Sequence, residues 1–276
     1  MVVDSHQHFW IYHPEHHEWI SDDMSVIQTD FLPHDLEPIL KANGVDGCIA
    51  VQTAQTEEET EFLLHLANQY DCIKGVVGWV NLCDENVGER LSKYAKNKYF
   101  KGVRWILQDE GDAFFYDANF RNGLAQLAKL NLTYDILVYH HQLSHVLELV
   151  REFPSNKFVL DHIGKPAIKE GELINWSNAM QKLGMFPNVC VKLSGMVTEA
   201  DWANWTEKDI VPFIDVVFGV FGANKIMFGS DWPVCLLASN YQNVKLLVDN
   251  YLKQLSAKER AMVLGGTACD FYSIHS

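Results

Sequence analysis

The chain has 276 residues, of which 48% are hydrophobic and 21% are charged, and its formal net charge is −14. This length and composition are typical of a globular protein with a large core, and many α/β barrels have this size. The negative charge argues against nucleic acid and anionic membranes as partners, because both would be repelled. A small neutral substrate is compatible with it.

Six cysteines are scattered along the chain without a C-x-x-C pair. This spacing predicts reduced thiols and argues against a disulfide framework or a zinc ribbon. Asp4 and His6 interrupt the apolar run at the N-terminus, so no signal peptide is expected there. No stretch reaches the roughly 18 apolar residues of a membrane-spanning helix, and we expect a cytoplasmic protein.

Short apolar or β-branched runs recur from one end of the chain to the other. They predict eight strands, over residues 2–9, 47–52, 73–80, 100–107, 133–139, 157–163, 189–195 and 225–229. Between them, apolar residues at three-to-four spacing predict helices over 57–70, 120–130 and 143–153. The sequence from Ser256 to Glu259 is typical of a capping box that opens a final helix.

Strands that alternate with helices predict a parallel sheet built from βαβ units. Eight such units favour an α/β fold of the closed (β/α)8 TIM-barrel type over an open doubly wound sheet. No G-x-G-x-x-G follows the first strand, which argues against a dinucleotide-binding domain. We expect one domain over residues 1–276, with the aromatic-rich and histidine-rich segment 10–33 as a long loop over the barrel mouth.

His6 and His8 are two residues apart at the end of the first predicted strand, so both side chains lie on one face. Asp231 follows the last predicted strand. Barrel enzymes place their sites where such strand ends meet, and two imidazoles and a carboxylate can hold one divalent cation. Asp231 could instead accept a proton from water. The competing interpretations are an ordinary polar strand end for the histidines and a helix N-cap for Asp231.

Asp161 and His162 close the sixth predicted strand. His162 is a third imidazole at a strand end, where it could ligate an ion or polarise a carbonyl oxygen. Strand alternation predicts that Asp161 faces the opposite side and serves the structure. Lys165, close behind, could bind an anion or simply be solvated.

Arg104 lies in the apolar fourth strand, where an unpaired charge would be costly. An inward-pointing arginine could bind a substrate carboxylate or a developing oxyanion, and the alternative is a structural ion pair. Lys192 raises the same question in the seventh strand. Gln52, at the end of the second strand, is a candidate hydrogen-bonding contact to substrate.

Four tryptophans fall at or beside predicted strand ends, at positions 10, 79, 105 and 232. Their flat surfaces suit the apolar face of a sugar ring, and Trp10 and Trp232 are our candidates for that contact. The alternative is rim packing under the loops. His140 and His141, after the fifth strand, remain ambiguous.

Five motifs in chain order resemble one family. They are Val-Asp-Ser-His-Gln-His-Phe-Trp, Lys-Gly-Val-Arg-Trp, Asp-His-Ile-Gly-Lys-Pro, Val-Lys-Leu-Ser-Gly and Phe-Gly-Ser-Asp-Trp-Pro-Val, between residues 3 and 234. The combination resembles the amidohydrolase superfamily, in the branch of L-fuconolactonases, L-rhamnonolactonases and related sugar lactone hydrolases.

This resemblance implies a TIM barrel in which His6 and His8 bind metal and Asp231 acts as ligand or general base. It also implies a catalytic role for His162 and a substrate-binding role for Arg104. The bridging ligand that two-metal relatives carry on strand four is missing, because Lys101 lies at the wrong end of that strand, and strand five has no obvious histidine. The implied cofactor is therefore one divalent cation, with Zn²⁺ as first choice, and the reaction could dispense with it.

The resulting hypothesis is hydrolysis of a sugar lactone to its aldonic acid, catalysed by a carboxylic ester hydrolase whose partner is the small-molecule lactone. Metal-dependent decarboxylation of an aromatic acid is the enzymatic alternative, and a non-catalytic ligand-binding barrel is the other. A homo-oligomer is compatible with the sequence, which does not define ring size or sugar stereochemistry.

Overall fold

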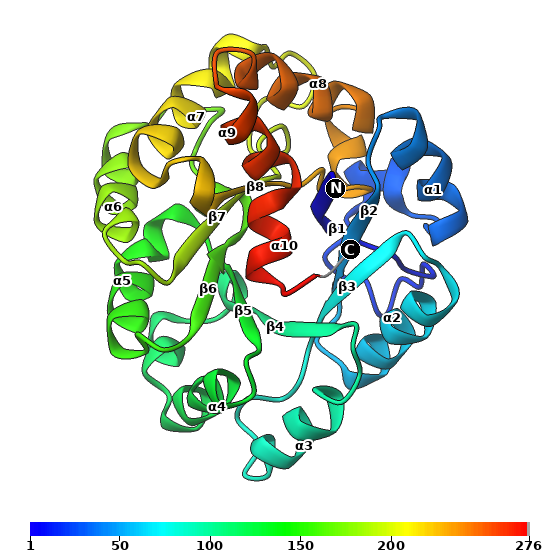
Figure 1. Cartoon of the computed structure of the whole chain (residues 1–276), viewed down its shortest axis with the longest axis vertical. Coiled ribbons are helices and arrows are strands. Elements are labelled where there is room, and N and C mark those ends of the chain that lie inside the picture. The colour runs from blue at the N-terminus through cyan, green and yellow to red at the C-terminus, as the bar shows by residue number, and fades with distance from the viewer. Residues whose placement is uncertain (275–276) are drawn as a thin grey trace.

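The fold is known from a computed structural model, which describes residues 1–274, and its centre is one sheet of eight parallel strands in sequence order (Figure 1). The strands are β1 (Val3–Gln7), β2 (Gly47–Val51), β3 (Ile73–Gly78), β4 (Phe100–Ile106), β5 (Thr133–Leu137), β6 (Lys157–Leu160), β7 (Val189–Leu193) and β8 (Ile226–Phe228). All eight predicted strands are present, and the last is shorter than expected at three residues.

The two ends of the sheet meet, so β1 lies beside β8. Gln7 and Trp232 form a parallel bridge, in which the His8 amide donates to the Trp232 carbonyl at 2.7 Å. The Asp231 amide donates to the His6 carbonyl at 2.8 Å on the same seam. These bonds close the ring, which confirms the predicted (β/α)8 TIM barrel.

Helices surround the ring and cover its outer face (Figure 1). They are α1 (Pro33–Ala42), α2 (Glu57–Gln69), α3 (Val87–Tyr94), α4 (Ala118–Lys129), α5 (Leu143–Glu152), α6 (Ile174–Gly184), α7 (Glu207–Phe221) and α8 (Tyr241–Leu252). The shorter helices α9 (Ala257–Ala261) and α10 (Thr267–Phe271) follow in the C-terminal segment. The three helices predicted from apolar spacing are α2, α4 and α5, each within two residues of its expected bounds. The capping box of Ser256 and Glu259 does open α9.

The C-terminal segment closes the barrel from one end. Figure 1 shows α10 across the centre of the strand ring. Phe271 and Tyr272 pack with the inward-facing strand residues Val77, Val159 and Met227 in one buried cluster. Within residues 1–274, one end of the barrel interior is therefore filled by apolar side chains.

The cysteines are free thiols, as their spacing predicts. Among the helices of residues 1–274, none is long and apolar enough to cross a membrane.

Close contact between β4 and β5 at Gly102 leads to a stability prediction. A Cβ atom there would lie 2.5 Å from the Thr133 carbonyl oxygen, which is backbone and cannot move aside. We expect Gly102→Ala to lower the free energy of unfolding by about 1–3 kcal/mol, as overpacking does, in urea denaturation. Gly219→Ala is the control: it lies in α7, and apart from its chain neighbours and the backbone of its own helix no atom lies within 4 Å of the added carbon. We expect it to stabilise by about 0.5–1 kcal/mol. Equal effects in the two variants would contradict this account.

Candidate active site

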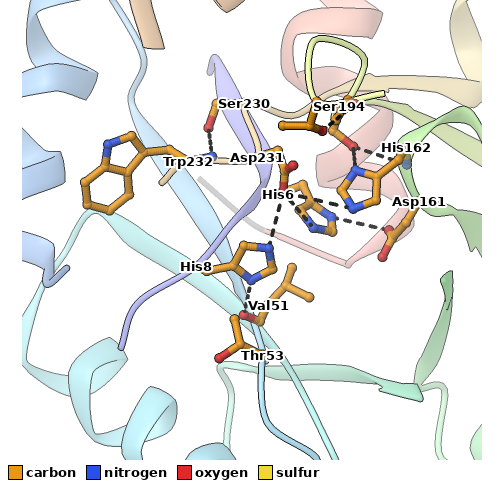
Figure 2. Close-up of polar contacts among 12 residues, drawn as sticks. His6, His8, Val51, Thr53, Asp161, His162, Ser194, Ser230, Asp231 and Trp232 are labelled. Atoms are coloured by element: carbon orange, nitrogen blue, oxygen red, sulfur yellow. Dashed lines mark hydrogen bonds and ion pairs between the residues drawn. The ribbon is translucent and has the colours of Figure 1, made fainter. Parts of the chain in front are cut away.

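Three imidazole nitrogens converge on one carboxylate oxygen at the open end of the barrel. The Nε2 atoms of His8, His6 and His162 lie 3.4, 3.7 and 4.0 Å from Oδ1 of Asp231. Figure 2 shows the four side chains facing a common point, although they come from the ends of β1, β6 and β8. The structure thus brings together the residues that the sequence singled out for chemistry.

The surroundings of His8 determine which of its ring nitrogens faces Asp231. Its Nδ1 lies 2.7 Å from the Val51 carbonyl oxygen, which can only accept a hydrogen bond, so Nδ1 carries the proton. Nε2 therefore presents its lone pair toward Asp231. Metal-binding histidines are commonly oriented in this way by a backbone carbonyl on the other nitrogen.

Ligand atoms of His6, His8 and Asp231 all lie within 4.8 Å of one another. Two imidazoles and a carboxylate are a donor set that zinc accepts, and catalytic zinc sites keep a further position for water or substrate. The side chains present therefore fit one divalent cation.

His162 occupies a strained turn. Its φ is 52°, and the neighbouring Ile163 has φ 49°, a conformation that is rare for a β-branched residue. Asp231 also has positive φ, at 58°. Backbone strain of this kind persists where surrounding contacts enforce it and clusters at functional sites. Here the left-handed backbone turns the side chains of His162 and Asp231 toward the open end of the barrel. A continued strand would instead have placed successive side chains on alternate faces of the sheet.

Ser194 orients the His162 ring. Its hydroxyl oxygen accepts from the His162 amide at 3.3 Å and lies 3.0 Å from Nδ1 of the same residue. Donation of the hydroxyl hydrogen to Nδ1 would place the ring proton on Nε2. Gly195 leaves room for this ring, since a Cβ atom there would lie 2.5 Å from Nδ1. In that tautomer His162 faces the site as a neutral N–H donor.

Burial and mutual contact leave the three histidines neutral and the Asp231 carboxylate ionised. Burial lowers the pKa of His162 to about 4 and also lowers the pKa values of His8 and His6, so the imidazoles are neutral near pH 7. Burial alone would raise the pKa of Asp231, but His162 and the other two histidines hold it below its ordinary range. The site therefore presents one carboxylate anion among neutral rings.

Arg104 is both paired and close to the site. Its Nη1 lies 3.1 Å from Asp161 Oδ2 and 3.4 Å from His6 Nε2, and its Nε donates to Gln52 Oε1 at 3.3 Å. The predicted substrate contact Gln52 is thus a fully buried side chain that holds Arg104 in place. Arg104 itself also lines the cavity described below. Its ion pair and its proposed role toward substrate are compatible.

The prediction that Asp161 faces away from the site is wrong. β6 ends at Leu160, and Asp161 begins a short 3-10 turn (Asp161–Gly164), so strand alternation no longer applies to it. Its Oδ1 lies 3.3 Å from His6 Nδ1 and 3.0 Å from the ammonium of Lys192. Figure 2 marks the contact between Asp161 and His6. Asp161 therefore belongs to the layer directly beneath the three histidines.

Lys192 and Asp135 complete that layer. The Lys192 ammonium lies 2.5 Å from Asp135 Oδ2 and 3.0 Å from His6 Nδ1, and both side chains are fully buried. Sequence reasoning gave Lys192 little weight and missed Asp135. The available signal was a charged residue inside an apolar strand, the criterion that identified Arg104.

A cavity of about 410 Å³ opens above this site. His8, His162, Asp231 and Arg104 contribute to its walls, together with the following residues: Trp19, Met24, Thr53, Ile106, Gln108, Asp109, Leu137, Tyr139, Lys165, Thr198, Glu199, Trp202, Val234 and Leu237. Its volume suits a small molecule. Trp19 and Met24 belong to segment 10–33, which therefore forms part of the mouth.

The aromatic walls differ from those expected. Trp10 and Trp232 are each 2% exposed and pack against Phe31, outside the set of lining residues. Trp19 and Trp202 line the cavity instead. A sugar-binding role for Trp10 and Trp232 stays a prediction, and their packing favours the alternative of rim support.

The histidines after β5 do not line the cavity above His8, His162 and Asp231. His140 Nδ1 is 2.9 Å from the Lys165 carbonyl oxygen, and His140 lines a neighbouring opening of about 600 Å³. His141 is exposed.

Comparison with known proteins identifies the family to which this chain belongs. The amidohydrolase family pattern matches residues 3–274. An L-fucono-1,5-lactonase of Burkholderia multivorans is 40% identical over 99% of this chain and 96% of its own length, and one of Burkholderia ambifaria is 34% identical over 99% and 95%. A crystal structure of a B. multivorans amidohydrolase with bound zinc is 40% identical, covers 100% of both chains and has a TM-score of 0.97. The chain is a member of the amidohydrolase family.

Proposed function

We propose that this protein hydrolyses a sugar lactone, of the L-fucono- or L-rhamnonolactone type, to the aldonic acid. The observation that carries the proposal is the convergence of His6, His8 and His162 on ionised Asp231 at the floor of a cavity that Arg104 also lines. The similarity to two L-fucono-1,5-lactonases supports the choice of substrate class.

Asp231 accepts the proton of the attacking water in this mechanism. The water oxygen bonds to the lactone carbonyl carbon, and Asp231 takes the proton that the water loses. A carboxylate with a depressed pKa is a weak base, so its contribution depends on position: it is already ionised and points into the cavity. The leaving group is an alkoxide, which departs more readily than an amine anion.

His162 and Arg104 stabilise the carbonyl oxygen as it gains negative charge. His162 offers a neutral Nε2–H, and Arg104 brings a fixed positive charge into a site largely removed from water. When the carbon–oxygen bond of the ring breaks, Asp231 returns its proton to the departing ring oxygen, which becomes a hydroxyl group. The product is the aldonic acid, which ionises at neutral pH.

One divalent cation, with Zn²⁺ as first choice, would be held by His6, His8 and Asp231. When bound, it supplies Lewis-acid polarisation of an oxygen at the site. Positive charge is also built into the chain through Arg104, 3.4 Å from His6. We therefore propose a metal that assists hydrolysis of an activated ester and that the reaction can do without.

Replacement of Asp231 tests the mechanism. We expect Asp231→Asn to lower kcat by about 10²–10⁴-fold, because the amide cannot accept the proton of water. Acid release from a panel of sugar lactones, followed with a pH indicator, measures this. Asp109→Asn is the matched control, since Asp109 lines the same cavity but makes no contact with the three histidines, and its kcat should stay within about threefold of wild type. Full activity in Asp231→Asn, or no lactone turned over by wild type, would refute the proposal; release of carbon dioxide from aromatic acids would point to the decarboxylase.

Replacement of His8 tests the metal site separately from activity. By isothermal titration we expect wild type to bind one zinc ion per chain, and His8→Gln to bind it at least about 100-fold more weakly, since one of three protein ligands is lost. His65→Gln, a change at an exposed histidine on α2, should bind as wild type does. Chelator-treated wild type should still turn over lactone. Equal zinc affinity in His8→Gln and wild type would exclude this ligand set.

A further inference from the structure

The C-terminal plug of the barrel makes a polar contact that packing does not require. Tyr272 directly follows α10 and is 2% exposed, among the apolar side chains that fill the closed end of the barrel. Its hydroxyl donates to Asp135 Oδ2 at 2.7 Å. The aromatic ring alone would fill this space. Packing therefore does not account for the hydroxyl group and its bond to Asp135.

Further contacts connect Asp135 to the candidate active site. Asp135 Oδ2 also accepts from the Lys192 ammonium at 2.5 Å. That ammonium lies 3.0 Å from His6 Nδ1, and the opposite nitrogen of the same imidazole faces Asp231. An unbroken series of buried contacts therefore leads from the chain terminus to the catalytic carboxylate, through three residues that lie on β5, β7 and β1.

Lys192 depends on these contacts for its position. Its side chain has four rotatable methylene groups, and its ammonium is held between Asp135 and Asp161, at 2.5 and 3.0 Å. The Tyr272 ring lies 5.7 Å below the same ammonium as a cation–π partner. Asp135 Oδ1 has no hydrogen-bond partner within residues 1–274. Among residues 1–274, the Tyr272 hydroxyl is thus the only hydrogen-bond donor besides Lys192 that fixes the Asp135 carboxylate.

We propose that Tyr272 is a positioning residue for the active site: through Asp135 it fixes Lys192 against His6, and so fixes the orientation of the His6 ring. Tyr272 touches neither the cavity nor the catalytic carboxylate, so its effect is indirect. Partners that orient a functional histidine from behind commonly change activity about 10–100-fold when removed. The kinetic part of this inference rests on the proposed lactone hydrolysis, whereas the structural part does not.

Tyr272→Phe tests the inference, because it removes the hydroxyl and keeps the ring. We expect kcat to fall about 10-fold while KM stays within about twofold, since the cavity walls are unchanged. We also expect the ¹⁵N resonances of the His6 ring, identified by their loss in His6→Gln, to shift in the unliganded protein. Both measurements are made below the melting temperature of each variant.

Tyr251→Phe is the matched control. It also removes a tyrosine hydroxyl bonded to an aspartate, the 2.8 Å bond to Asp215 between α8 and α7 on the outside of the barrel. We expect wild-type kcat and unshifted His6 resonances in this variant. Any loss common to both variants reports on stability alone.

The outcomes separate the two proposals. Shifted His6 resonances in a protein that hydrolyses no lactone would leave the positioning role intact and refute the proposed function. Unshifted resonances together with kcat within about twofold of wild type in Tyr272→Phe would overturn the positioning role. If Tyr272→Phe does not fold, Asp135→Asn breaks the same series one step higher and should shift the same resonances; unchanged resonances there would likewise overturn it.

Discussion

Closure of the strand ring is the constraint on which the rest of this structure depends. An open parallel sheet would leave β1 and β8 as distant edges, with His6 and Asp231 far apart. In the closed ring the Asp231 amide donates to the His6 carbonyl, so the two residues are neighbours on one seam. Backbone hydrogen bonds along this seam therefore hold His6 and His8 beside Asp231.

Charge balance inside the barrel distinguishes Asp231 from the other buried carboxylates near the site. Asp135 and Asp161 pair with Lys192, and Arg104 also contacts Asp161. Within residues 1–274, Asp231 has no lysine or arginine at ion-pair distance, and its neighbours are imidazoles. A buried carboxylate without a fixed cation retains its capacity to bind a metal ion or to accept a proton. Burial keeps the imidazoles neutral, and the paired charges beneath them contact His6 from below.

The direction of a side chain can be predicted from strand alternation where the backbone is extended, but not in a strained turn. His6 lies on β1 and His8 directly after it, and their two-residue spacing correctly predicted that both side chains lie on one face. Asp161 and His162 lie in a turn with left-handed backbone, where the two-residue period is lost. The same rule therefore misplaced Asp161. Trp19 and Trp202 could not be assigned to the cavity because loop positions carry no periodic signal.

The sequence by itself determined the strand count, the barrel class and the residue types at the strand ends, because these depend on hydrophobic periodicity and on the cost of burying charge. Only the tertiary structure decided which charges pair with one another. Asp135, Lys192 and Tyr272 are far apart in the chain, and nothing local to any of them identifies its partner. Their contacts depend on barrel register and on where the terminal segment enters the ring, which are long-range properties of the closed fold.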